Sequence, residues 1–155
     1  MRLLYGLALL LFACNAPQPS TPEKAPISQA LAPELPTVDT NLYETFRMMD
    51  GDVERLMKKY YMVFLKTGPE RGQDPSEAAK LQKAHLAHLG AMVEAKKICM
   101  VGPFESEGAI RGIAIYSTPT MAEADSLAHA DPAVKAGRLS VEVHPWWAAV
   151  GAKLF

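Results

Sequence analysis

The chain has 155 residues, and its 16 Lys and Arg against 17 Asp and Glu give a formal net charge of −1 at pH 7. This length fits one domain, and the balanced charge, with no basic stripe, argues against a nucleic-acid partner. With 49% hydrophobic and 21% charged residues, the composition is that of an ordinary globular protein.

Residues 1–13 are expected to be a cleaved lipoprotein signal peptide. Arg2 precedes an apolar run, residues 3–13, which is too short to span a bilayer because spanning takes about 20 residues. Ala13 directly before Cys14 resembles the bacterial lipobox, in which the cysteine becomes the acylated first residue of the mature protein. We therefore expect a lipidated Cys14 that anchors the protein in the bacterial cell envelope, facing the periplasm or the exterior. An ordinary secretory signal peptide, cleaved elsewhere, is the alternative.

Residues 14–38 are rich in proline, with Ser, Thr, Gln and Ala between the prolines. Such a segment buries too little apolar surface to offset the entropy of ordering it, and proline-rich chains are extended and semi-rigid. We expect a tether that holds the domain away from the membrane.

The segment that follows, residues 39–59, has the spacing of an amphipathic helix. Its apolar residues recur at intervals of four, three, four and three: Leu42, Phe46, Met49, Val53 and Leu56. Asn41 followed by Glu44 resembles a capping box, and Gly51 is a helix breaker. We therefore expect an N-terminal helical extension, divided at Gly51 into two short helices, that packs on the domain.

Residues 60–150 are expected to form one α+β domain. Runs of β-branched, aromatic and other apolar residues bounded by turn residues predict strands over 60–67, 98–104, 110–117 and 139–144. Helices are predicted over 76–96, capped by Asp74 or Ser76, and over 121–129, capped by Thr120, with a short turn or helix over 132–136. The order β-α-β-β-α-β is that of a ferredoxin-like fold, an antiparallel sheet with both helices on one face.

The sheet face without helices is expected to be apolar. In the first strand of the domain, both alternating sets are apolar: Tyr61, Val63 and Leu65 on one face, and Tyr60, Met62 and Phe64 on the other. An antiparallel sheet with one wet face shows apolar and polar residues in alternation, so this pattern predicts a partner over the second face. We expect that partner to be a second copy, packed sheet to sheet in a homodimer.

His85 is the first candidate for chemistry. On a helical wheel it falls inside the apolar face of the helix over 76–96, where an imidazole costs free energy unless it is hydrogen-bonded. It is either a satisfied core histidine or a general acid/base in a cleft between helix and sheet. Asp131, before Pro132, either caps the short helix that follows or orients an imidazole. Glu142 lies on a face expected to be buried, so it either pairs with a cation such as Arg138 or Arg111 or lines a wet cavity.

Other chemistries find little support in the sequence. His85 and His88 are three residues apart, a spacing that a metal site could use, but no third ligand accompanies them and we expect no metal. No phosphate-binding loop, serine nucleophile elbow or cysteine nucleophile is present, and we expect no cofactor. Cys99, in the apolar run Ile98-Cys99-Met100-Val101, is expected to be a small buried hydrophobe.

Several motifs together resemble the YCII-related family over residues 60–147. They are His85-Leu86-Ala87-His88-Leu89, Val101-Gly102-Pro103-Phe104, Arg111-Gly112, the run over residues 131–139, and Glu142-Val143-His144-Pro145-Trp146. The resemblance implies a ferredoxin-like fold, a dimeric α/β barrel and a shared His and Asp near a pocket, which match His85 and Asp131. Within these motifs the candidate substrate-binding residues are His88, Gly102, Pro103, Arg138, Glu142 and His144. The family usually has a glycine near Lys96, where this sequence has lysine, and most members carry no lipoprotein leader.

The function expected from this reasoning is a small-molecule pocket on each subunit of an envelope lipoprotein. His85 would act as a cofactor-free acid/base and Asp131 as its orienting partner, in an isomerase- or lyase-type reaction. This expectation rests on analogy with the family. A non-catalytic small-molecule binding module and a structural dimeric module of the envelope are the alternatives.

Overall fold

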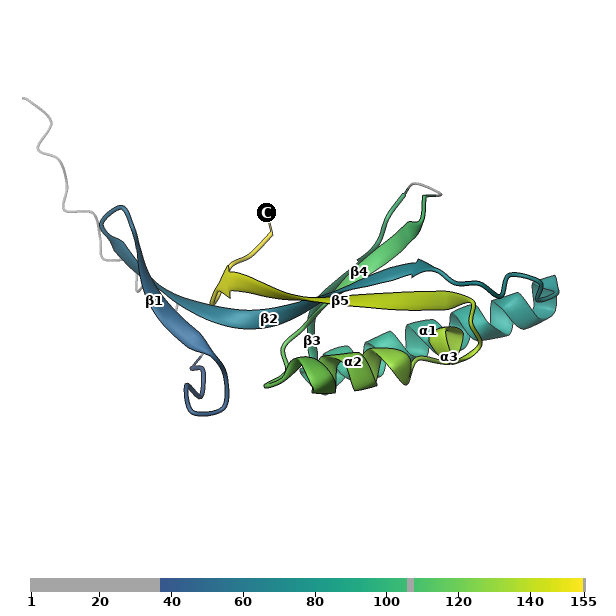
Figure 1. Cartoon of the computed structure of the whole chain (residues 1–155), viewed down its shortest axis with the longest axis horizontal. Coiled ribbons are helices and arrows are strands. Elements are labelled where there is room, and N and C mark those ends of the chain that lie inside the picture. The colour runs from purple at the N-terminus through teal and green to yellow at the C-terminus, as the bar shows by residue number, and fades with distance from the viewer. Residues whose placement is uncertain (1–36, 106–107, 155) are drawn as a thin grey trace, which may run out of the picture. The chain divides into compact units, whose positions relative to one another are not determined.

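The computed structural model describes residues 37–105 and 108–154. Its helices and strands (Figure 1) follow one another in the order β1 (Thr45–Asp50), β2 (Val53–Thr67), α1 (Pro75–Glu94), β3 (Ile98–Pro103), β4 (Ile110–Tyr116), α2 (Met121–His129), α3 (Pro132–Lys135) and β5 (Leu139–Ala149). The predicted signal peptide, the lipidation site Cys14 and nearly all of the predicted tether lie outside the described residues.

The strands form an antiparallel sheet centred on β2. Residues 61–66 of β2 pair with β4 on one edge and with β5 on the other, and β3 pairs with β4. From β2 onward the order of elements is β-α-β-β-α-β, with the short α3 before β5, and the strands lie in the order β3-β4-β2-β5. The helices lie together on one side of this sheet (Figure 1). The predicted α+β, ferredoxin-like fold is therefore confirmed, whereas the second copy that would complete a dimeric α/β barrel stays a prediction.

The helical extension predicted over residues 39–59 is wrong. β1 and the first part of β2 form an antiparallel hairpin, in which Thr45 pairs with Lys58. Gly51 takes a φ of 61° in the tight turn between them, a conformation that glycine adopts without steric cost. The alternation of four- and three-residue intervals is a local pattern, and strand pairing overrides it. The first part of β2 pairs with β1 on one edge, and the continuation of β2 pairs with β5 on the other edge.

The core lies between the helices and one face of the sheet. Its buried cluster contains Tyr61, Val63, Leu65, Leu89, Ile98, Ala114, Tyr116, Ala124 and Ala128. The alternate residues of β2 point to the face without helices, and they are only half-buried: Tyr60, Met62 and Phe64. The chain therefore leaves an apolar sheet face partly open to solvent, as the alternation in this strand predicted.

The two ends of α1 are defined by side-chain and backbone capping. Asp74 is the N-cap, and its carboxylate accepts from two backbone N–H groups of the first turn at 2.8 and 2.9 Å. At the other end Lys96 has a φ of 57°, in the left-handed region. The N–H groups of Lys96 and Lys97 donate to the carbonyls of Val93 and Met92, both at 2.9 Å. This is a Schellman motif with a lysine where glycine is the usual residue.

Cys99 is exposed, contrary to the prediction that it is buried. The register between β3 and β4 shifts between Ile98 and Met100, and Cys99 lies in this irregularity. A bulge interrupts the alternation of side chains between the two faces of a strand. Ile98 consequently takes the buried position, and the Cys99 thiol donates to the carbonyl oxygen of Ile115 at 3.4 Å.

Candidate active site

A pocket of about 710 Å³ lies between α1 and the β3–β4 side of the sheet. Its volume is that of a site for a small molecule. Many of its lining side chains are apolar, among them Leu65, Leu86, Leu89, Val93, Val101 and Phe104. The polar lining side chains are Arg71, Gln82, His85, Glu94, Arg111 and Arg138. The pocket is thus an apolar cavity with a few polar groups, which is the usual composition of a ligand site.

His85 borders this pocket from the buried face of α1 and is 7% exposed. Its ring Nδ1 lies 2.7 Å from Oδ2 of Asp131. Because a carboxylate accepts hydrogen bonds, Nδ1 carries the proton and donates it, and in the neutral imidazole Nε2 is left with the lone pair. No described residue hydrogen-bonds to Nε2. The predicted contact between the two side chains is confirmed, and their catalytic role stays a prediction.

Asp131 both caps α3 and holds the imidazole. Its Oδ1 accepts from the backbone N–H of Ala133 at 2.7 Å, while Oδ2 faces His85. Pro132, at the first position of α3, has no N–H to satisfy. The carboxylate is 2% exposed, and a buried charge of this kind is tolerated when donors satisfy its oxygens. The two roles that the sequence offered as alternatives are therefore performed by the two oxygens of one side chain.

Tyr116 lies in the core close to this pair. Burial raises the pKa of its hydroxyl to about 12, and the negative charge of Asp131 acts in the same direction. The phenol therefore remains protonated at neutral pH. Tyr116 adds no charge to the surroundings of His85.

The residues predicted to bind a ligand divide into two groups. Gly102, Pro103 and Arg138 line the pocket. His88 does not, because its Nε2 lies 3.1 Å from the carbonyl oxygen of Leu127 and its ring is directed to α2. One helical turn of α1 brings His88 beside α2, while His85 meets α3, so the two histidines have different neighbours. The prediction that His88 belongs to this pocket is corrected accordingly.

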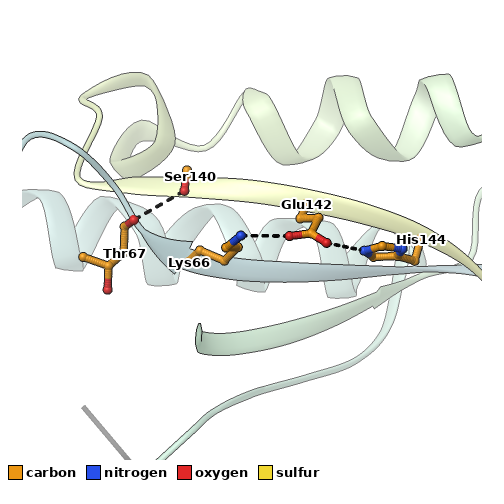
Figure 2. Close-up of polar contacts among 5 residues, drawn as sticks. All are labelled: Lys66, Thr67, Ser140, Glu142 and His144. Atoms are coloured by element: carbon orange, nitrogen blue, oxygen red, sulfur yellow. Dashed lines mark hydrogen bonds and ion pairs between the residues drawn. The ribbon is translucent and has the colours of Figure 1, made fainter. Parts of the chain in front are cut away.

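Glu142 and His144 also lie outside the pocket, on the sheet face without helices. Figure 2 shows Lys66, Glu142 and His144 in a row along β2 and β5. Lys66 Nζ donates to Glu142 Oε2 at 2.9 Å, and His144 Nε2 lies 2.6 Å from Glu142 Oε1. These hydrogen bonds, first that from Lys66, lower the pKa of Glu142. The cation that pairs with Glu142 is thus Lys66 and neither Arg138 nor Arg111.

Strand register explains this separation from the pocket. Glu142 pairs with Phe64, and His144 with Met62, so both share the helix-free face of those residues. The rings of His144 and Phe64 pack in a T-shaped arrangement, with centroids 5.7 Å apart. In the single chain, Glu142 and His144 therefore cannot reach a ligand that contacts His85.

Four polar pocket residues escaped the sequence reasoning as site residues: Arg71, Gln82, Glu94 and Arg111. Gln82 lies three residues before His85 on α1, so helical spacing could have identified it. Arg71 lies in the segment between β2 and α1, where no periodicity indicates direction. Arg111 was considered only as a partner of Glu142, because its strand face could not be assigned to the pocket without the position of α1.

In the described part of the chain, no group of three or more His, Cys, Asp or Glu side chains is arranged to hold a metal ion. His85 and His88, whose spacing suits a metal, contact different acceptors, Asp131 and the Leu127 carbonyl. Within the same residues, no helix has the length and apolarity required to cross a membrane.

Comparison with known proteins gives a family match and a weak structural likeness. The model of the YCII-related domain matches residues 60–147, which is more than half of the chain. No curated protein matches the chain. Among solved structures, the chain is similar to the 5-chloro-2-hydroxyhydroquinone dehydrochlorinase of Burkholderia phenoliruptrix AC1100 in complex with 2,5-dihydroxybenzoquinone. The sequence identity is 23% and the TM-score is 0.44, and the match covers 56% of this chain and 92% of that chain. The chain belongs to the YCII-related family.

Proposed function

We propose that this chain binds a small molecule in the pocket between α1 and the sheet and transfers a proton with His85. The observation that carries this proposal is the His85–Asp131 pair at the border of the pocket, with Nδ1 held at 2.7 Å and Nε2 without a described partner. A base that lines a cavity and is oriented by a carboxylate is the arrangement that general acid/base catalysis requires.

The proposed reaction needs no cofactor. Nε2 of His85 removes a proton from an acidic carbon or oxygen of the ligand, and Asp131 stabilises the imidazolium that forms. The imidazolium then returns the proton to another atom of the ligand, which completes an isomerisation, or protonates a leaving group, which completes an elimination. A ligand seated against the apolar lining would displace water from around His85, which would strengthen these electrostatic contacts.

A ligand screen and one pair of variants test this proposal. Small molecules that bind the folded state raise the apparent melting temperature, so the screen reads binding without knowledge of the reaction. A compound that binds is then incubated with wild type and with His85→Gln, a variant that keeps polarity and approximate size. We expect wild type to convert the compound and the Gln variant to bind it without conversion. Binding without conversion by both proteins would favour the alternative, a non-catalytic binding module.

The homodimer is the second part of the proposal. The half-buried apolar residues on the helix-free face of the sheet, Tyr60, Met62 and Phe64, support it, because apolar side chains that no element of the chain covers favour an interaction site. A second copy packed sheet to sheet would cover this face in both subunits. Light scattering on residues 35–155, which cluster as one unit, should give twice the monomer mass. A monomer at micromolar concentration would contradict the dimer.

The lipid anchor and the envelope location complete the proposal, and they rest on the sequence of residues 1–14. Mass spectrometry of the mature N-terminus should find an acylated Cys14, in a protein recovered with the membrane fraction. A free N-terminus at any other residue would exclude the anchor, and it would leave the proposed pocket chemistry unaffected.

A further inference from the structure

Three arginines around the pocket form no ion pair with a described carboxylate. The arginines of the hairpin do: Arg47 lies 2.6 Å from a carboxylate oxygen of Glu54, and Arg55 lies 2.7 Å from one of Asp50. The three that line the pocket, Arg71, Arg111 and Arg138, take part in none of the ion pairs of the described residues. The described arginines that lack an ion pair are thus all found at the pocket.

The hydrogen bonds of these arginines go to neutral acceptors. Nη1 of Arg138 donates to the side-chain oxygen of Gln73 at 2.9 Å, and Nη1 of Arg71 donates to the carbonyl oxygen of Arg138 at 3.2 Å. The half-buried Arg111 has no side-chain hydrogen bond with a described residue. Because a guanidinium has five N–H donors, most donors of all three side chains remain available.

Backbone contacts bring the segment of Arg71 against the segment of Arg138. The N–H of Gly68 donates to the Arg138 carbonyl at 3.0 Å, and the N–H of Glu70 donates to that of Gly137 at 2.9 Å. Residues 68–70 and residues 137–138 lie so close that a Cβ on Gly68 would collide with the Gly137 carbonyl. Gly137 has a φ of 68°, in the left-handed region that favours glycine. Arg71 therefore lies beside the Arg138 backbone in a fixed arrangement. Arg71 and the segment that carries Arg138 thus line the same part of the pocket.

Carboxylates of the site do not balance these charges. Asp131 is engaged by His85 and by the N–H of Ala133, and it does not line the pocket. Glu94, near the end of α1, is the acidic residue among the described lining residues. Three guanidinium groups against one carboxylate make the pocket electropositive, while its remaining walls are largely apolar and include the ring of Phe104.

We propose that the ligand of this pocket is a small organic anion, with an apolar body and a carboxylate or enolate held by Arg71, Arg111 and Arg138. This inference deepens the proposed function by naming its ligand class, and it rests on the same pocket, but it does not require that His85 transfers a proton. Arginine binds planar carboxylates through two parallel hydrogen bonds, and the apolar walls accept the rest of the molecule. The anionic group would approach the arginine side of the pocket while the apolar body lies along α1.

Calorimetry with matched probes tests the ligand class on the mature chain. Benzoate and benzamide have the same apolar body and differ in charge, and inorganic phosphate carries charge without an apolar body. We expect benzoate to bind, with an affinity that falls as salt rises, and benzamide and phosphate to bind at least about tenfold more weakly. Benzamide or phosphate binding as tightly as benzoate, or no benzoate binding at millimolar concentration, would overturn the proposal.

Arginine variants locate the binding. Arg111→Gln and Arg138→Gln should each weaken benzoate binding about tenfold, because each removes a charge-assisted contact. Arg47→Gln, on the hairpin, is the control that should bind as wild type does. Arg111 has no side-chain hydrogen bond to lose, so its variant remains informative if the Arg138 variant unfolds. Unchanged affinity in Arg111→Gln would refute the arginine site.

A His85→Gln variant separates this inference from the proposed function. It should keep benzoate binding, because the anionic group is held by arginines. If it binds benzoate and no compound is ever converted by wild type, the anion site stands and the proton transfer falls. If wild type converts a neutral compound and ignores benzoate, the anion site falls and the proton transfer stands.

Discussion

Replacing Asp131 by Asn tests how the carboxylate orients His85. The amide keeps an oxygen that can cap α3 through the N–H of Ala133, but it can present an NH2 group where Oδ2 now accepts from His85. An NH2 group cannot accept the Nδ1 proton. The imidazole must then move its proton to Nε2, so that Nδ1 becomes the acceptor and the atom that faces the ligand loses its lone pair.

The expected loss of stability depends on burial, because the side chains of Asp131 and His85 are both less than one-tenth exposed. Exchange of a hydrogen bond to a charged group, worth about 1.5–3 kcal/mol, for a neutral one, worth about 0.5–1.5 kcal/mol, should lower the free energy of unfolding by about 1 kcal/mol. Asp131→Ala removes the cap as well, which should cost about 1 kcal/mol more. We therefore expect stability to fall in the order wild type, Asn variant, Ala variant.

Urea unfolding followed by circular dichroism measures these differences, and ¹⁵N NMR of the imidazole reports which ring nitrogen carries the proton. In wild type the proton should be on Nδ1, and in Asp131→Asn on Nε2. The double variant with His85→Gln should lose less stability than the two single changes added together, because the residues are in contact. An Asn variant with wild-type stability and the proton still on Nδ1 would show that Asp131 does not orient the ring.

Three further predictions concern the fold. Lys96→Gly should raise the free energy of unfolding by about 1 kcal/mol, since it relieves a left-handed φ, and Ala91→Gly within the same helix should lower it by a similar amount. Urea titrations in which both variants are less stable than wild type would contradict backbone strain at Lys96. Between pH 10.0 and about 12 the unfolded chain releases the Tyr116 proton before the folded chain does, so stability should fall as pH rises, by at most about 2.7 kcal/mol. Tyr116→Phe should remove this contribution to the loss of stability at alkaline pH. If the stability of the variant falls with pH as steeply as that of wild type, the contribution of Tyr116 is excluded. Tyr43→Ala should lower the free energy of unfolding by about 1–2 kcal/mol, because the centre of its ring lies 3.6 Å from Nζ of the buried Lys58. The same change should cost less stability in a protein that already carries Lys58→Met. Equal losses in both backgrounds would exclude a cation–π contact.

Local patterns were enough to predict most elements of the domain. The strand alternation around Val63 and the order of elements depend on residues close in sequence, and both are found in the structure; of the two caps expected, Asp74 and Ser76, the structure has Asp74. The same local reasoning failed for residues 39–59, where a helical spacing was real but strand pairing with distant residues determined the conformation. It also failed at Cys99, because a register shift between β3 and β4 cannot be read from β3 alone.

For the site, the sequence by itself determined the direction of His85, because helical periodicity places it on the buried face of α1, and it determined the capping chemistry of Asp131. Only the tertiary structure decided that these side chains meet, since they are 46 residues apart and their contact depends on how α3 packs on α1. Strand register decided that Glu142 faces away from the pocket, and the close approach of two loops brought Arg71 to Arg138. Periodicity fixes which way a side chain points on its own element, but which partner it then meets depends on long-range pairing and packing, because these set the position of one element against another.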